Sequence, residues 1–539
     1  WGIQRTINNF ARCASLAKQA GYDGVEIMGS EGYLLNQFIA KRTNKRTDKW
    51  GGPYENRIRF PLEVVRAVRK RVGTDFIIIF RLSMLDLVED GSTKEEVIQL
   101  AKALEEAGVT ILNTGIGWHE ARIPTIATSV PRAAFSGITA QIKEHVTIPV
   151  VTSNRINTPQ VAEDVLSSGK ADMVSMARPF LADPDLVNKA KENDEKSINV
   201  CIACNQACLD HVFEQKVASC LVNPFACHET EMPVESTTTP KKLIVVGAGM
   251  AGLACAVTAA KRGHQVELWE KASEIGGQFN MAKQIPGKGE FYETLKYFSH
   301  QISKYGVKLK LNHCATTELL QQSNAEQIVL ATGVHPRPLT LPGIEHPNVL
   351  SYVDVLKHHK PVGDRVALIG AGGIAFDVVE FLNHEVHNGQ HLPNVREYFE
   401  HWGIDGAFEQ RSGLTTAKPP VAKRQITMMQ RSKGKLGSRL GKTTGWIHRS
   451  QAKSFGVKML SEVTYEQIDD NGHLHLQVKG KPQILEVDTI ILCAGQVPNR
   501  DLLPSLSGLP VTLIGGADVA SELDAKRAIR QGTEFALTF

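Results

Sequence analysis

The sequence lacks the features that define several classes of protein. It has no run of about 18 apolar residues, so no transmembrane helix is expected. Basic and acidic residues nearly cancel, 61 against 57, and a net charge of +4 does not indicate binding to nucleic acid or to an anionic membrane. With 42% hydrophobic and 22% charged residues, it is neither a disordered nor a fibrous chain. These absences leave a globular protein, and 539 residues suffice for three or four domains.

The start of the chain and its cysteines bear on location. The first residue, Trp1, is not methionine, and no apolar signal segment follows it, so we expect no secretory signal and a natural N-terminus upstream. Nine cysteines would form disulfides only in an oxidising compartment, yet four of them crowd between Cys201 and Cys220. This crowding favours a metal site and a cytoplasmic location. The sequence does not decide between a monomer and a homo-oligomer.

The first 190 residues alternate short apolar runs, rich in β-formers, with helical patterns. This alternation predicts βαβ units around a parallel sheet. Thr93 and Glu96 form a capping box, and Thr158 with Pro159 opens another helix. Polar residues cluster where the strands end, which is where barrels place their active sites. The expected strands are 23–28, 76–83, 111–117, 149–155 and 173–179.

Five β/α units are too few for a closed barrel, which has eight units in about 250 residues. We therefore interpret residues 1–190 as the last five units of a TIM (β/α)₈ barrel, rather than as an open doubly wound sheet. The predicted fold class is α/β. A cysteine-rich segment and linker (191–240) and two Rossmann-like domains complete it, one at 241–360 with 491–539 and one at 361–490.

The first glycine-rich motif follows a predicted strand and opens a predicted helix. Its glycines are Gly247, Gly249 and Gly252, and Glu270 ends the next strand. Glycines at this spacing let the backbone approach a pyrophosphate, and the acid suits ribose hydroxyls. Together with residues 274–278, 331–333 and 515–518, the region resembles the FAD module of the two-dinucleotide flavoproteins. The resemblance adds two residues to the FAD site, Gln278 and Asp518.

A second glycine motif predicts a nicotinamide domain. Gly370 and Gly372 occupy the first two glycine positions, and Ala375 takes the sixth. The partner strand, 425–429, is followed by Arg431 instead of an acid. Because arginine suits a 2′-phosphate, we expect NADPH to be preferred, although Arg431 as an ordinary solvated surface residue stays open. Residues 384–424, inserted before that strand, show no periodicity and are interpreted as a surface excursion.

The crowded cysteines have the spacing C-x₂-C-x₃-C-x₁₁-C. Four thiolates so close in sequence can converge on one soft centre, either zinc or a 4Fe-4S cluster. Three near-contiguous cysteines with a distant fourth favour the cluster, and zinc and free thiols remain the alternatives. The four residues are Cys201, Cys204, Cys208 and Cys220.

Residues 36–60 carry the signature of old-yellow-enzyme flavin barrels, together with residues 29–33 and 117–120. With the cysteine cluster and two dinucleotide motifs, the whole chain resembles the bacterial NADPH-dependent 2,4-dienoyl-CoA reductases. The resemblance implies that the barrel begins upstream, that Tyr33 is the proton donor and that His119 assists it. A packing role for Tyr33 and a structural role for His119 are the alternatives. The implied flavin contacts are Arg81, Arg155, Ala177, Arg178 and Gln206, the first four of them to FMN.

This resemblance implies an enzyme of unsaturated fatty acid β-oxidation whose partner is an acyl-CoA substrate. NADPH would reduce FAD, the 4Fe-4S cluster would pass single electrons to FMN, and FMN would reduce a 2,4-dienoyl-CoA. The alternatives are a trimethylamine-dehydrogenase-like amine oxidase, an enone or enoate reductase on the same scaffold, and an inactive electron-transfer fragment.

Overall fold

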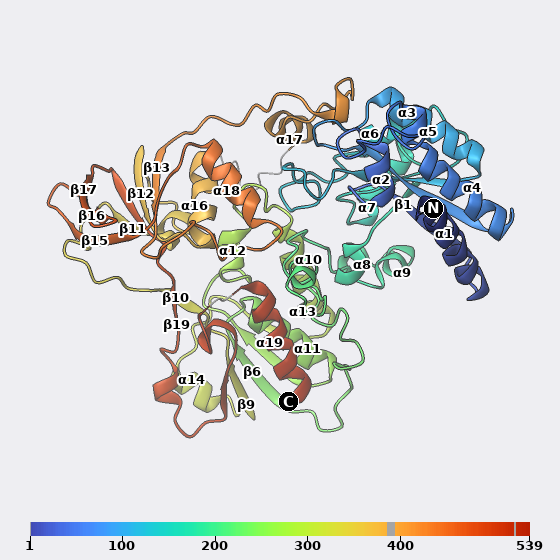
Figure 1. Cartoon of the computed structure of the whole chain (residues 1–539). Helices are drawn as coiled ribbons and strands as arrows, with labels where there is room; N and C mark the ends of the chain where they lie inside the picture. The colour runs from blue at the N-terminus through green and yellow to red at the C-terminus, as the bar shows by residue number, and fades with distance from the viewer. Residues whose placement is uncertain (1, 385–393, 522–523) are drawn as a thin grey trace. The chain divides into compact units, whose positions relative to one another are not determined.

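The structure, a computed structural model, describes residues 2–384, 394–521 and 524–539 (Figure 1). The chain divides into two compact units, one of residues 1–177 with 393–419 and the other of residues 178–392 with 420–539. The finer domain boundaries expected from the sequence remain predictions. Within the described ranges, no helix has the length and apolar character needed to cross a membrane.

Five parallel strands form the sheet of the first unit (Figure 1). Their spatial order repeats their order in the chain, and a doubly wound sheet would instead reverse direction at a switch point. Consecutive order is that of a β/α barrel, so the partial-barrel interpretation is confirmed. The strands, close to their predicted positions, are β1 (Gly24–Gly29), β2 (Ile77–Leu85), β3 (Ile111–Ile116), β4 (Val150–Thr152) and β5 (Met173–Val174).

The helices around this sheet begin where their capping residues predict. Helix α5 (Lys94–Ala107) starts with the complete capping box of Thr93 and Glu96, and Thr158 caps α7 (Pro159–Ser167) by accepting from the N–H of Val161. Their apolar sides pack on the strands. The other helices of the unit are α1 (Gly2–Gln19), α2 (Leu34–Ile39), α3 (Tyr54–Arg57), α4 (Arg59–Val72) and α6 (Ser136–Lys143).

Residues 394–419 pack into the barrel unit, which corrects their interpretation as a surface excursion. Helix α17 (Val395–Trp402) lies beside α6 in Figure 1, and the Phe135 and Phe399 rings are 5.5 Å apart. Tyr398 is buried and donates its hydroxyl hydrogen to the carbonyl of Pro124. The interpretation missed these residues because α17 is short and its contacts, such as that of Tyr398 with Pro124, lie far away in the sequence. Residues 385–393 of the expected excursion lie outside the described residues.

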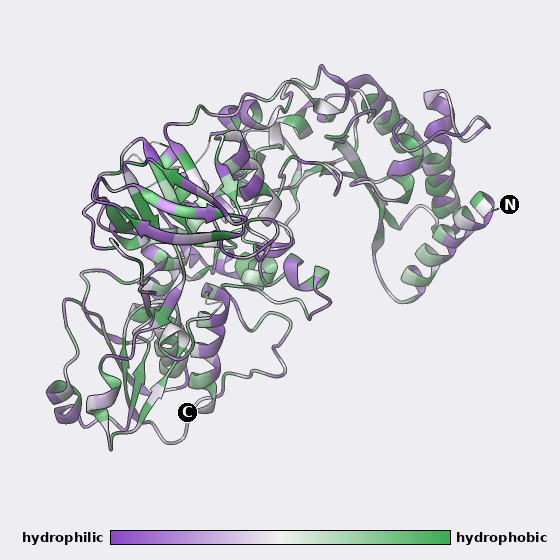
Figure 2. Ribbon diagram, turned by 60° about the vertical axis from the view of Figure 1, so that its left-hand side comes forward, coloured by the Kyte–Doolittle hydropathy of each residue, from purple (hydrophilic) through white to green (hydrophobic). Residues whose placement is uncertain are grey.

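The second unit contains two five-stranded parallel sheets, in which four adjoining strands have the same order and the edge strand comes last in the chain in one sheet and first in the other. One has the order β20-β9-β6-β7-β8 and the other β11-β18-β12-β13-β14. Figure 2 shows both apolar and polar stretches along the ribbon of the protein. The first sheet comprises β6 (Lys242–Val246), β7 (Gln265–Trp269), β8 (Lys308–Lys310), β9 (Gln327–Leu330) and β20 (Val511–Leu513). The second comprises β11 (Val349–Ser351), β12 (Arg365–Ile369), β13 (Gln425–Met429), β14 (Lys458–Leu460) and β18 (Thr489–Leu492).

Each sheet has a central helix that starts at its glycine motif. Helix α11 (Met250–Lys261) follows β6, and α16 (Gly373–Asn383) follows β12. Helix α19 (Ala525–Thr538) crosses α11 closely at Gly532. A Cβ there would lie 2.2 Å from the carbonyl oxygen of Ala251, so only glycine allows this approach. The smaller elements include the antiparallel pair β10 (Val334–Pro336) and β19 (Gln496–Pro498), α18 (Gly445–Ser454), and the meander β15 (Val463–Ile468), β16 (Leu474–Val478) and β17 (Lys481–Leu485).

Candidate active site

Tyr33 and His119 meet at the carboxyl-terminal edge of the barrel sheet. Tyr33 precedes α2 in the loop after β1, and His119 lies in the loop after β3. The Tyr33 hydroxyl is 3.0 Å from Nε2 of His119, and the two rings meet edge to face. Both side chains reach the surface, with Tyr33 48% exposed. A phenol in hydrogen-bond contact with an imidazole can deliver a proton to a bound molecule.

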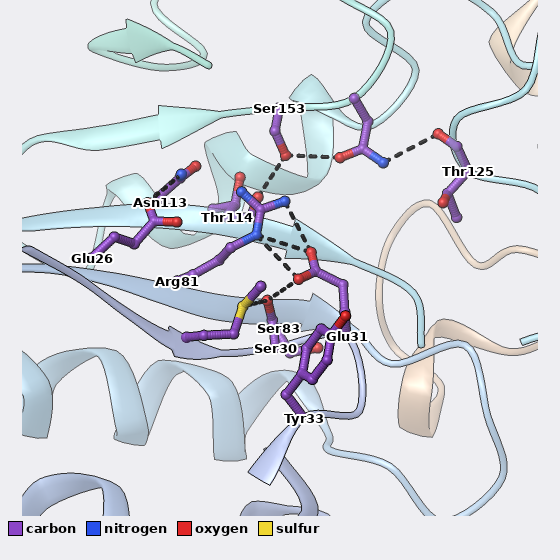
Figure 3. A network of polar contacts seen from close by, with 12 residues as sticks. Glu26, Ser30, Glu31, Tyr33, Arg81, Ser83, Asn113, Thr114, Thr125 and Ser153 are labelled. Atoms are coloured by element: carbon purple, nitrogen blue, oxygen red, sulfur yellow. Dashed lines mark hydrogen bonds and ion pairs between the residues drawn. The ribbon is translucent and has the colours of Figure 1, made fainter. Parts of the chain in front are cut away.

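Two polar pairs lie across the neighbouring strands (Figure 3). Arg81, on β2, contacts both carboxylate oxygens of Glu31, with Nε at 3.0 and 3.2 Å and a terminal nitrogen at 2.9 Å. Asn113, on β3, donates to Glu26 at 2.8 Å, while its buried Oδ1 accepts no hydrogen bond from any described residue. A partnerless buried oxygen beside a guanidinium fits a missing polar ligand such as the edge of a flavin ring.

The other three expected FMN residues have different surroundings. Arg155 is buried, and its Nε donates to the carbonyl of Val130 at 2.8 Å. Ala177 is exposed, at the end of the barrel unit. Arg178 donates to the side chain of Asn205 at 2.5 Å and lines the cavity of the clustered cysteines. The structure therefore places Arg178 near the cysteines and Arg81 near Tyr33.

The first glycine motif forms a tight turn between β6 and α11. A Cβ on Gly252 would lie 1.9 Å from the carbonyl oxygen of Gly247, whereas a Cβ on Gly249 would meet nothing within 4 Å. The open space at Gly249, beside the helix N-terminus, fits a pyrophosphate. Glu270 follows β7, and its carboxylate accepts from the N–H groups of Ala248 and Ala272, each at 2.8 Å. The acid is thus fixed beside the turn.

Gln278 and Asp518, expected at the FAD site, lie in the same unit as this turn. Gln278 is exposed and its side chain accepts from Gln496 at 2.9 Å. Gln496 lies on β19, in the strand pair that links the two Rossmann-like folds. Asp518 follows the short turn 515–517 and accepts from Gln531 of α19 at 2.7 Å.

The second glycine motif has the same open turn. A Cβ on Gly370 would lie 2.3 Å from the carbonyl oxygen of Cys493, and one on Gly372 would meet nothing within 4 Å. Arg431 follows the end of β13 and is exposed. An exposed cation at the end of the second strand is placed where a coenzyme 2′-phosphate is bound in such domains.

The four clustered cysteines line one cavity of about 20 Å³ with Arg178 and Asn205. Burial raises the pKa of the Cys204, Cys208 and Cys220 thiols, and neighbouring thiols raise each of them further. The buried Oε1 of Gln206 accepts no hydrogen bond from any described residue. In the described ranges, no three His, Cys, Asp or Glu side chains have the geometry to hold a metal ion. The thiols therefore share a cavity without forming a ready single-ion site.

Sequence reasoning missed two acids that organise the barrel site. Glu31 binds Arg81, and Asp86, directly after β2, is buried among four donors. Glu31 has an unusual φ of 55°, which no sequence pattern signals for glutamate. A sequence feature could have indicated Asp86, because it is a carboxylate at the end of a buried strand, where barrel sites are built.

Both parts of the chain match known protein families. Residues 2–197 match the NADH:flavin oxidoreductase / NADH oxidase family, and residues 241–527 match pyridine nucleotide-disulphide oxidoreductases. A metal reductase of Desulforamulus reducens is 37% identical over 510 residues, covering 94% of this chain and 75% of that protein. An NADH oxidase of Thermoanaerobacter brockii is 33% identical over 537 residues, covering 97% of this chain and 76% of the oxidase.

A solved structure is similar over the whole length of this chain. The complex of 2-naphthoyl-CoA reductase with 2-naphthoyl-CoA superposes with a TM-score of 0.88 at 30% identity, over 100% of this chain and 76% of that one. Histamine dehydrogenase from a Rhizobium species superposes with a TM-score of 0.82 at 22% identity, which shows the shared fold alone.

Proposed function

Because the chain belongs to the NADH:flavin oxidoreductase / NADH oxidase family, with a pyridine nucleotide-disulphide oxidoreductase module, we propose that it reduces 2,4-dienoyl-CoA thioesters with NADPH. Family membership makes it a flavin oxidoreductase, with FMN in the barrel and FAD and NAD(P)H in the second module. The proposal adds the substrate, the choice of NADPH and a 4Fe-4S relay. The observation that carries it is the 3.0 Å contact between the Tyr33 hydroxyl and His119.

The Tyr33–His119 pair suits reduction of an alkene conjugated to a carbonyl group. Bound FMN supplies the hydride for the far alkene carbon. The carbon beside the carbonyl then needs a proton, and a phenol keeps its proton at neutral pH until such an acceptor forms. His119, in contact with the Tyr33 hydroxyl, can hold it in place or replace its proton. A conjugated acyl-CoA in the similar 2-naphthoyl-CoA reductase complex supports thioesters as the substrate class.

A 4Fe-4S cluster held by Cys201, Cys204, Cys208 and Cys220 fits the cysteine cavity better than zinc. Zinc needs its ligands to converge on one tetrahedral point, and no described group of side chains has that geometry. A cluster has separate iron atoms, so its thiolates can lie further apart around a shared space. Iron and acid-labile sulfide analysis of anaerobically prepared protein tests this part. Stoichiometric zinc without sulfide would remove the relay from the proposal.

The substrate assignment is tested by turnover with NADPH. Flavin-loaded protein should reduce hexa-2,4-dienoyl-CoA faster than 2-cyclohexenone or cinnamate, and it should not oxidise trimethylamine. Tyr33→Phe should slow the dienoyl-CoA reaction about a hundredfold or more, since general acid catalysis contributes roughly 10²–10⁴-fold. The same variant should still reduce an artificial dye through the FAD module. Equal turnover of cyclohexenone and the thioester would favour the second candidate, an enone reductase. Tyr33 and His119 would serve either substrate, because their proposed role is to protonate the reacting alkene and not to bind the CoA group.

A further inference from the structure

Asp86 is a buried acid with an unusual number of partners. It directly follows β2 and is 1% exposed. Its Oδ1 accepts from the Ser83 hydroxyl at 2.8 Å, the Trp118 indole at 2.9 Å and the Asn36 amide at 3.2 Å. Its Oδ2 accepts from the N–H of Ser92 at 2.7 Å. Four donors on two oxygens suit a carboxylate, which only accepts hydrogen bonds.

One set of these contacts leads to Tyr33. Asn36 donates to Asp86 through Nδ2 and accepts through Oδ1 from the N–H of Gly32 at 2.9 Å. Gly32 is the residue before Tyr33 and has a φ of +83°. A Cβ on Gly32 would lie 3.0 Å from the Trp118 ring, so the backbone there rests against the indole. Asp86 therefore fixes the peptide that carries Tyr33 through one intervening side chain.

A second set of contacts leads to His119. Trp118, the residue before His119, is held at both ends by Asp86: its indole N–H binds the carboxylate, and its backbone N–H binds the Asp86 carbonyl at 3.0 Å. The indole is 7% exposed. The neighbouring N–H of Gly117 donates to the Leu85 carbonyl at 2.7 Å. The loop that carries His119 is thus tied to the end of β2.

We propose that Asp86 is a positioning residue that sets the hydrogen bond between Tyr33 and His119. The residues immediately before both members of the pair are anchored, directly or through Asn36, to this one carboxylate. Tyr33 and His119 are both exposed residues, so the position of their 3.0 Å contact depends on the backbone that carries them. The inference rests on the proposed role of the pair in proton transfer.

Asp86→Asn is the informative substitution because it preserves size and removes one acceptor. In either orientation of the carboxamide, its NH₂ group faces a donor that the carboxylate accepts. The matched control is Asp172→Asn. Asp172 is another carboxylate of the barrel unit and accepts from the N–H of Val150 at 2.9 Å. Neither Asp172 nor Val150 contacts Tyr33 or a neighbour of Tyr33 in the sequence. Thermal melts of both variants establish that they fold.

The first test measures the Tyr33–His119 contact by NMR, without any substrate. Holoenzyme labelled at the Cε1 atoms of histidine gives an NMR signal for His119, assigned by its loss in His119→Gln. Tyr33→Phe should shift this signal in the wild-type background and should hardly shift it in the Asp86→Asn background. Asp172→Asn should leave the response intact. An unchanged response to Tyr33→Phe in Asp86→Asn would overturn the proposal.

The second test is a double-mutant cycle on flavin reoxidation by hexa-2,4-dienoyl-CoA. Asp86→Asn should lower kcat about a hundredfold, the cost of misplacing a reacting group by roughly 1 Å, and should change KM much less. In the Tyr33→Phe background it should have little further effect, because both substitutions remove the same proton delivery. NADPH-dependent dye reduction should be unaffected throughout. Equal losses in both backgrounds would assign Asp86 a general structural role.

Two further results can be foreseen: Asp86→Asn does not fold, or the wild-type protein does not reduce the dienoyl-CoA. If Asp86→Asn does not fold, Trp118→Phe removes a single donor to the carboxylate and should reduce the shift of the His119 signal that Tyr33→Phe causes; an undiminished shift would overturn the proposal. If wild-type protein does not reduce the dienoyl-CoA, the proposed function fails, whereas the NMR cycle still decides whether Asp86 sets the Tyr33–His119 contact.

Discussion

The two Rossmann-like folds of the second unit are built alike. Four adjoining strands have the same order in both sheets, and in both the first glycine donates its N–H to the last residue of the next strand. The N–H of Gly247 binds the carbonyl of Trp269 at 2.8 Å, and that of Gly370 binds Met429 at 3.0 Å. The middle glycines, Gly249 and Gly372, both border open space. These shared features form the phosphate turn, so they cannot distinguish one dinucleotide from another.

The two folds differ at the residue after the second strand. Glu270 in the first fold turns back to the glycine loop and binds the N–H of Ala248. Gln430 in the second turns away, donating to the carbonyls of Ser432 and Gly434, and Arg431 follows it at the surface. We therefore expect the glycines to fix where a phosphate binds and the end of the second strand to select the nucleotide.

The two folds should differ most in how well they tolerate a substitution at the sixth position of the glycine motif. Gly252→Ala puts a methyl group 1.9 Å from the backbone oxygen of Gly247, so the turn must move. Overpacking of this kind costs roughly 1–3 kcal/mol or more. We expect the variant to lose bound FAD on gel filtration and to melt at a lower temperature.

The matched change in the second fold is Ala375→Gly. Ala375 is buried, so its Cβ is already accommodated in the core, and its N–H bonds to the Gly372 carbonyl at 3.0 Å. Removing this Cβ should cost only roughly 0.5–1 kcal/mol and leave FAD content unchanged. Normal FAD content in Gly252→Ala would contradict the close approach at the first turn.

A second difference lies inside the central helices. Eight residues after the middle glycine, α11 has Val257 and α16 has Glu380, and both are buried. Burial, with a smaller effect from Asp377, raises the pKa of Glu380 to about 8, while Lys288 opposes the shift. The folded state therefore holds a proton that the unfolded chain releases near pH 4.3.

The sign of the resulting pH dependence follows from this raised pKa. The stability contributed by protonated Glu380 is complete below about pH 4.3 and is lost as pH rises through about 8. The melting temperature should fall between pH 5 and 9, and Glu380→Gln should flatten that fall. Exposed Glu466 of the same fold provides the control, since Glu466→Gln should keep the wild-type slope. Identical slopes for wild type and Glu380→Gln would show that Glu380 does not titrate this way.

Local signals explain which parts of the fold were predictable. The barrel strands are short buried runs, and Thr93 and Thr158 cap helices by contacts within four residues, so the sequence itself contains both partners. Packing of residues 394–419 depends on contacts with residues far away in the chain, such as Tyr398 with Pro124. The short helix α17 does not show from its own sequence which surface it covers, so the burial of this segment was not predicted.

The candidate site follows the same rule. Tyr33 and His119 were singled out by motif, and strand ends at one edge of a sheet bring such residues together. The Arg81–Glu31 pair depends instead on the register of β1 against β2, in which Met28 faces Arg81, and on the unusual backbone at Glu31. Register and left-handed backbone are set by the whole sheet, which explains why this partner of Arg81 was not found from its own neighbours.

The last prediction tests the difference at the strand ends, and it concerns binding of the coenzyme rather than stability of the fold. Arg431→Ala should weaken NADPH binding about tenfold or more, because a charge-assisted hydrogen bond to the 2′-phosphate contributes roughly 1.5–3 kcal/mol. NADH has no such phosphate, so its binding should hardly change. Lys458, at the start of β14, offers a matched exposed cation at the other end of the strands, and Lys458→Ala should affect neither coenzyme. Dissociation constants from flavin-fluorescence titration measure both. Equal losses for NADPH and NADH would make Arg431 a structural residue and move the selection of the 2′-phosphate to Lys433 or elsewhere in the fold.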